Sequence, residues 1–84
     1  RWTVAMKWAI HISREAVAQM HTIDRQLMPN LWAALHELAA DPDKNHFQPT
    51  EEDPSRYWIG IDGDVVVTFE IIDEKRVIRV LQID

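Results

Sequence analysis

The sequence predicts an α+β domain with the element order β-α-α-β-β-β, in which two helices pack on one face of a mainly antiparallel four-stranded sheet. Three observations predict it. A short alternating segment opens the chain, helix formers with apolar residues at helical spacing follow, and three β-rich segments separated by turn signals come last. All residues, 1–84, should form this single domain, because a chain of 84 residues has no room for a second one.

The first strand is expected at residues 8–12, where apolar and polar side chains alternate, with a start as early as Val4. Ser13 comes next and can cap a helix, because its hydroxyl can accept a hydrogen bond from a free amide of the first turn. This helix should run from Arg14 to near Thr22 or Ile23. Its apolar side chains at helical spacing are Ala16, Val17 and Met20.

The second helix should begin between Asp24, a capping residue, and Pro29, which a helix tolerates only in its first turn. It should end at Asp41-Pro42. One apolar stripe is expected to pack on the sheet, formed by Leu31, Leu35 and Leu38 with Trp32 beside them.

Residues 41–55 contain three prolines and five acidic residues with almost no periodicity, which predicts a loop without an element of its own. The remaining strands are expected at 57–61, 65–72 and 77–83. Asp62-Gly63 between the first two is a strong hairpin signal.

A two-residue turn at Glu74-Lys75 sets the register of the last hairpin, with Glu70 opposite Arg79. Two sheet faces then separate. The core face, expected beneath the helices, comprises Val65, Val67, Phe69, Ile71, Ile78 and Val80. The opposite face, which we call the open face, comprises Val66, Thr68, Glu70, Ile72, Val77, Arg79 and Leu81, with Trp58 on the neighbouring strand. Because an open sheet face this apolar usually needs a cover, we expect these residues to bind a partner.

Charge and composition narrow the class of protein. Nine Lys and Arg against fourteen Asp and Glu give a net charge of −5, which argues against nucleic acid as the main partner, although a local basic patch could survive. The chain has no cysteine and no apolar run long enough to span a bilayer. We therefore expect a cytoplasmic protein without a membrane segment.

The element order and the C-terminal segments resemble the RelE/ParE superfamily of bacterial toxin-antitoxin proteins. The resemblance covers most of the chain, and its most specific part lies in three segments, Tyr57-Trp58-Ile59, Gly63-Asp64 and residues 71–78. It implies the fold predicted above and a cognate antitoxin that wraps the toxin with a helix or an extended strand.

The resemblance also implies where catalytic residues would lie, and this chain lacks them. Members that cleave messenger RNA on the ribosome carry basic residues on the open face, where cations stabilise charge on the scissile phosphate. Trp58 and Gly60 occupy the positions of two lysines, and Val66 that of an arginine. A further arginine and tyrosine would fall after Asp84. We therefore assign no catalytic residue, while the family's gyrase-poisoning branch shows that a toxin needs no nuclease site.

Two patterns are compatible with metal binding, but neither predicts a site. Asp41, Asp43, Asn45 and Glu52 have the spacing of a calcium loop, yet His46 stands where that loop requires glycine. The remaining histidines, His11, His21 and His36, show no close zinc-ligand spacing. We expect a solvated acidic loop, surface histidines, no metal and no cofactor.

The aromatic and charged residues also have ordinary interpretations. Trp2, Trp8, Trp32 and Trp58 could stack nucleic-acid bases, but they fall on separate elements without interleaved basic residues, so packing is expected. Glu70 and Arg79 are expected to form a cross-strand ion pair rather than an active pair. Lys75-Arg76 is expected to be a charged turn.

The sequence thus predicts a toxin component of a toxin-antitoxin module, or a protein derived from one, that acts by protein binding. Two alternatives remain. One is a residual enzyme, either a divergent ribosome-dependent RNase that uses Arg56, Arg79 and histidines or an unrelated hydrolase. The other is a structural or regulatory homodimer joined through Trp58, Val66 and Leu81.

Overall fold

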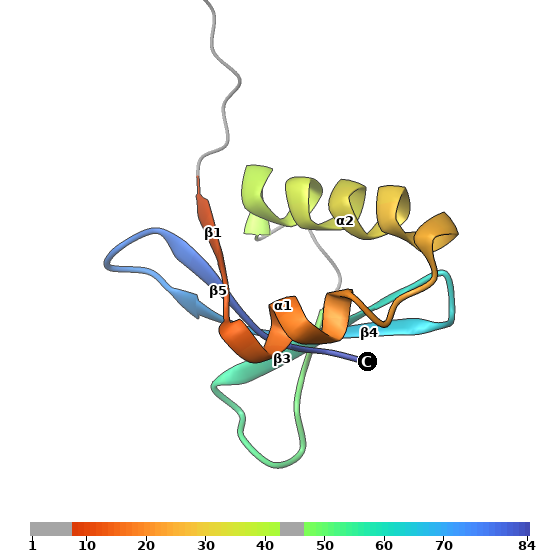
Figure 1. Cartoon of the computed structure of the whole chain (residues 1–84). Coiled ribbons are helices and arrows are strands. Elements are labelled where there is room, and N and C mark those ends of the chain that lie inside the picture. Colours follow the sequence, from red (N-terminus) through yellow and green to blue (C-terminus); the bar gives the residue numbers. More distant parts are fainter. Residues whose placement is uncertain (1–7, 43–46) are drawn as a thin grey trace, which may run out of the picture.

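The computed structural model describes residues 8–42 and 47–84, so an early strand start at Val4 lies outside the described residues. The elements in chain order are β1 (Ala9–Ile12), α1 (Arg14–Met20), the 3-10 turn η1 (Arg25–Leu27), α2 (Met28–Ala40), β2 (Gln48–Pro49), β3 (Arg56–Ile61), β4 (Val65–Ile72) and β5 (Val77–Ile83). The α+β class and the predicted order of its main elements are confirmed (Figure 1).

The strands form one five-stranded sheet in the order β1-β5-β4-β3-β2, with β1 parallel to β5 and the other neighbours antiparallel. The fifth strand corrects the prediction of four. Residues 41–55 were expected to carry no element, but β2 pairs with β3 through Gln48 opposite Trp58 and Pro49 opposite Tyr57. A proline is tolerated there because β2 is an edge strand whose outer side needs no amide donor.

Both helices begin within the predicted ranges, α1 at a side-chain cap and α2 after a capped 3-10 turn. Ser13 caps α1 by accepting a hydrogen bond from the Ala16 amide at 3.1 Å, and its hydroxyl donates to the Leu81 carbonyl of β5 at 3.2 Å. Asp24 caps η1, which leads directly into α2 with Pro29 in the first turn. Helix α1 ends at Met20, slightly before the expected end near Ile23.

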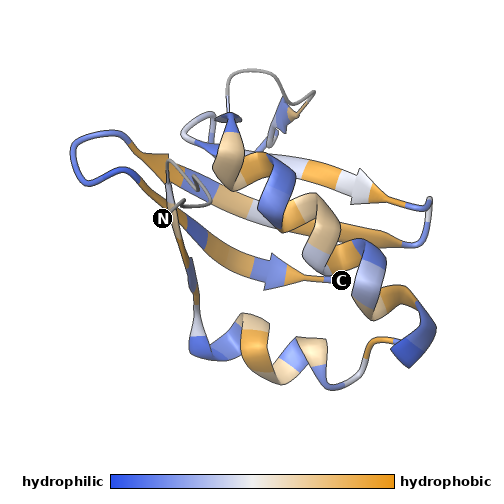
Figure 2. Cartoon of the chain, turned by 90° about the horizontal axis from the view of Figure 1, so that it is seen from above, coloured by the Kyte–Doolittle hydropathy of each residue, from blue (hydrophilic) through white to orange (hydrophobic). Residues whose placement is uncertain are grey.

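Helix α2 lies across the strands and covers the core face (Figures 1 and 2). Its predicted stripe is confirmed, since Leu31, Leu35 and Leu38 are all at most 1% exposed. Trp32 is 42% exposed, so the expectation that it packs beside them on the sheet is wrong. One residue along a helix turns the side chain by about 100°, which carries Trp32 off the buried stripe.

No helix in the described segments is long and apolar enough to cross a membrane.

The β4–β5 hairpin has the predicted register, with Phe69 opposite Val80 and Glu70 opposite Arg79. Beyond this point a bulge places Thr68 opposite Gln82, so Leu81 is an extra residue on β5. The bulge reverses the alternation of the strand, and Ile83 therefore enters the core at 1% exposure. The predicted core face is confirmed, with Val65, Val67, Phe69, Ile78 and Val80 buried and Ile71 packed against them.

We predict that Phe69→Ala destabilises the fold by about 3–5 kcal/mol, because it empties the centre of the core. Phe69 is fully buried and its ring centroid lies 5.4 Å from that of Phe47 and 6.0 Å from that of Tyr57. Urea unfolding followed by tryptophan fluorescence measures the change. Val66→Ala on the open face is the control and should cost about 0.5 kcal/mol; equal losses in both variants would contradict the assignment of the two faces.

Candidate functional site

The open face is the side of the sheet opposite α2, and it carries the residues predicted for it. Trp58 and Val66 are the exposed large hydrophobic residues of the described strands, each 38% exposed. Thr68, Glu70, Ile72, Val77 and Leu81 are half-buried, while Arg79 is exposed. The structure therefore brings the predicted partner-binding residues together on one surface; whether they bind a partner stays a prediction.

A row of ionisable side chains crosses this face. The register places His11 of β1 beside Arg79, Arg79 opposite Glu70, and Glu70 opposite Arg56 of β3. Arg79 Nη1 lies 3.5 Å from Glu70 Oε1, as the expected cross-strand ion pair requires, and Arg56 Nε lies 3.6 Å from Asp53 Oδ2. Both arginines are thus partly neutralised by carboxylates. The sequence did not place His11 in this row, because nothing in it showed which strand β1 joins.

Leu81 occupies a special position on the open face because it is the bulged residue of β5. Its backbone carbonyl accepts the hydrogen bond from Ser13, which ties the start of α1 to the sheet. Its side chain borders a hollow with Arg56 and the first residues of α1. This hollow lies where the predicted surface meets the start of α1.

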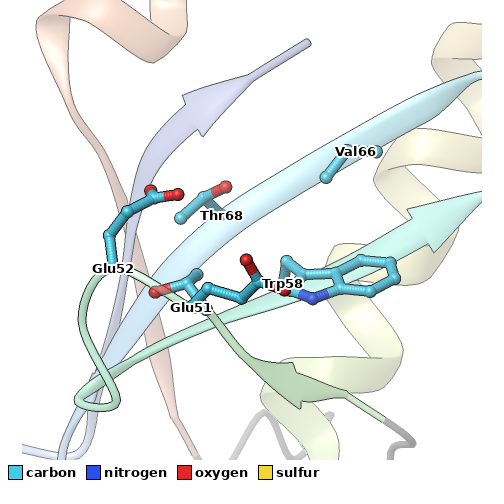
Figure 3. A pocket seen from close by; sticks show the side chains of 6 residues that line it. Glu51, Glu52, Trp58, Val66 and Thr68 are labelled. Atoms are coloured by element: carbon cyan, nitrogen blue, oxygen red, sulfur yellow. The ribbon is translucent and has the colours of Figure 1, made fainter.

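Trp58 forms one wall of a shallow pocket of about 390 Å³ on the open face (Figure 3). The pocket is lined by Thr50, Glu51, Glu52, Trp58, Val66 and Thr68. The Trp58 indole lies along β3 near Gly60. Its Cζ3 atom is 3.8 Å from the position that a Cβ on Gly60 would occupy. The sequence did not predict that Glu51 and Glu52 lie beside Trp58; it placed Glu52 only in a calcium-loop pattern, within a segment expected to have no helix or strand.

The loop that carries these glutamates is held by its own hydrogen bonds. The Thr50 hydroxyl donates to the Asp53 carbonyl at 2.7 Å, and the Thr50 amide donates to the Arg56 carbonyl at 2.8 Å. The Ser55 hydroxyl and amide both donate to Asp53 Oδ1, at 2.6 and 3.0 Å. These two bonds, with a smaller effect of Arg56, hold the pKa of Asp53 below its ordinary value. The charged carboxylate is therefore part of the loop structure.

The metal and stacking patterns find no geometric support in the described segments. Within residues 8–42 and 47–84, no three His, Asp or Glu side chains gather closely enough to hold a metal ion. Asp43, Asn45 and His46 of the calcium pattern lie outside the described residues, as does Trp2. Trp32 and Trp58 lie on α2 and β3 respectively, and Trp8 directly precedes β1.

The fold and the uncovered sheet face together define the class, an α+β domain with the fold of RelE toxins. The intact Escherichia coli RelBE toxin-antitoxin complex contains a chain with TM-score 0.75 and 19% identity, covering 90% of this chain and 93% of that one. An archaeal RelE-RelB complex from Pyrococcus horikoshii gives 0.71 and 14%, with 94% of both chains covered. The RelBE2 complex from Mycobacterium tuberculosis gives 0.65 and 18%, covering 92% and 88%.

These similarities confirm the predicted RelE-like architecture, with one short strand added at the edge. Because the sequence identities are below 20%, these similarities establish the fold alone. No protein-family model and no curated protein matches the sequence.

We predict that the order of the 50–55 loop depends on ionised Asp53. A lowered pKa means that the folded state stabilises the carboxylate, so its contribution is present above the unfolded-state pKa of about 3.9 and is lost as the pH falls through the folded-state value. The amide chemical shift of Ser55 should stay constant between about pH 5 and 7 and move only at lower pH. Asp53→Ala should shift this resonance at neutral pH; an unchanged Ser55 resonance in that variant would contradict the role of Asp53.

Proposed function

We propose that this chain is the toxin component of a toxin-antitoxin module, or a protein derived from one, and that it acts in the cytoplasm by binding protein rather than by cleaving messenger RNA. The observation that carries the proposal is the chemistry of the open face. Trp58, Gly60 and Val66 stand at the positions where the resemblance implies catalytic cations. Exposed apolar side chains favour protein contacts, whereas RNA cleavage requires unpaired positive charge.

The structural relatives support a partner of the antitoxin kind. Their names describe RelE chains crystallised with RelB antitoxins, and this chain shares their fold. Its small size adds a physical reason, because a domain of 84 residues buries a limited core and gains stability from a bound partner.

The ionisable row favours a second candidate, a divergent messenger-cleaving enzyme. His11, Arg79 and Arg56 could hold a phosphodiester if their carboxylate partners turned away. Two ion pairs oppose this arrangement, those of Arg79 with Glu70 and of Arg56 with Asp53. Arg79→Ala would abolish messenger cleavage by such an enzyme, and the integrity of messenger RNA is therefore the readout that separates it from a protein-binding toxin.

We predict that induced expression of the natural full-length protein arrests bacterial growth, that messenger RNA stays intact, and that co-expression of the protein encoded beside it restores growth. The arrest would be measured by culture density and the messenger by primer extension. Messenger cleavage that disappears in Arg79→Ala would establish the enzyme instead. Normal growth, with no protein captured from the neighbouring gene, would contradict the toxin.

We predict that Val66→Asp weakens binding of the neighbouring gene product at least tenfold without unfolding the chain, because a buried unpaired carboxylate is costly at an interface. Calorimetry measures the affinity, and circular dichroism the fold. Val17→Asp is the matched control, since Val17 is 43% exposed but lies on α1, away from the open face.

Loss of binding in Val17→Asp alone would move the interface to the helical side and contradict the open face as the binding surface. If the isolated chain is a dimer that Val66→Asp converts to monomer, the open face joins two copies, as the homodimer alternative requires.

A further inference from the structure

The pocket beside Trp58 has a composition that suits a cation. An exposed indole forms one wall, and the carboxylates of Glu51 and Glu52 stand on the loop beside it. Figure 3 shows both glutamate side chains extending on the side of the sheet that carries Trp58, Val66 and Thr68. An aromatic face and carboxylates attract positive charge by separate mechanisms, and their attractions add at one site.

No basic side chain of residues 8–42 and 47–84 neutralises these carboxylates. The arginines of the open face are engaged elsewhere, Arg56 with Asp53 at 3.6 Å and Arg79 with Glu70 at 3.5 Å. Glu51 and Glu52 therefore give this end of the face two negative charges without a described counterion, in a chain whose net charge is already −5.

The pocket is also organised before anything binds. Hydrogen bonds of Thr50, Asp53 and Ser55 hold the turn on which the two glutamates stand. The Trp58 indole lies near Gly60 of the same strand, and the residue is 38% exposed. A ligand therefore does not have to order the loop before binding, which lowers the entropic cost.

We propose that this pocket binds an arginine side chain of a protein partner, with the guanidinium on the Trp58 indole and paired with Glu51 or Glu52. The inference rests on the proposed function, because it specifies how the open face receives its partner. Arginine fits better than a compact ion, since its planar guanidinium both stacks on an aromatic ring and forks to a carboxylate. Val66 can pack against its methylene groups, and the shallow pocket admits a side chain from a flat protein surface.

The test is an NMR titration of the folded full chain with the peptide N-acetyl-Gly-Arg-Gly-amide. The reporter is the indole N–H resonance of Trp58, assigned by its absence in Trp58→Phe. We expect a saturable shift in the millimolar range that weakens as salt is added. The same peptide with citrulline in place of arginine has nearly the same shape without the charge, and it should bind at least fivefold more weakly.

The double variant Glu51→Gln with Glu52→Gln should lower the affinity for the arginine peptide at least fivefold while leaving the fold intact. The charge-matched control is Glu15→Gln with Asp64→Asn, which removes two exposed acids outside the pocket and should change the affinity less than twofold. Equal binding of the arginine and citrulline peptides, or equal affinity in the two double variants, would overturn the proposal. So would tighter binding of the matching lysine peptide, because a compact ammonium does not need the stacking geometry.

Two results separate this inference from the proposed function. A partner captured through the open face and lost in Val66→Asp, but bound equally well by the Glu51/Glu52 double variant, would leave the proposed function standing and overturn the role of the pocket. Saturable arginine binding in a chain that neither arrests growth nor captures the neighbouring gene product would support the pocket's chemistry and reject the proposed function.

Discussion

The strand β4 is the constraint on which the rest of the structure depends. It is paired on both sides, and its side chains Val65, Val67 and Phe69 are at most 2% exposed beneath the helices. Because side chains alternate along a strand, burying these three commits Val66, Thr68 and Glu70 to the other face. The register of β4 therefore determines both the core and the candidate binding surface. A one-residue shift in that register would exchange the two sets of side chains.

Much of this arrangement is readable from the sequence because it follows from local periodicity. The alternation in β4 and β5 places the core residues, and the turn between them sets Glu70 opposite Arg79. Other features depend on distant contacts. Leu81 looks like any other alternating residue until the bulge makes it an extra one, and Gln48-Pro49 becomes a strand because β3 offers it an edge. The pocket went unpredicted for the same reason, since Glu51 and Glu52 acquire a shared position only when that edge forms.

The charges on the open face form pairs, so little positive charge is left unbalanced there. Positive charge on this face is present, but each arginine meets a carboxylate, and the pocket adds two carboxylates more. Such exposed pairs contribute little stability, so their main effect is on which partners are attracted. A polyanion is not attracted to this face, because carboxylates nearly neutralise its arginines and Glu51 and Glu52 add negative charge beside them. A protein with apolar and cationic side chains is complementary to this face, because its apolar groups can pack on Trp58 and Val66 and its cations can pair with Glu51 and Glu52.

The parallel pairing of β1 with β5 links the beginning of the described chain to its end, because Ile10 lies opposite Ile78. During synthesis on the ribosome, β1 emerges before β5 and has no partner strand until β5 has been made. The helices α1 and α2 can form meanwhile from local contacts, but the sheet edge must wait for a contact of high sequence separation. β1 therefore stays without its partner strand while all the intervening elements are made, a period in which a chaperone or an early-bound partner would protect it.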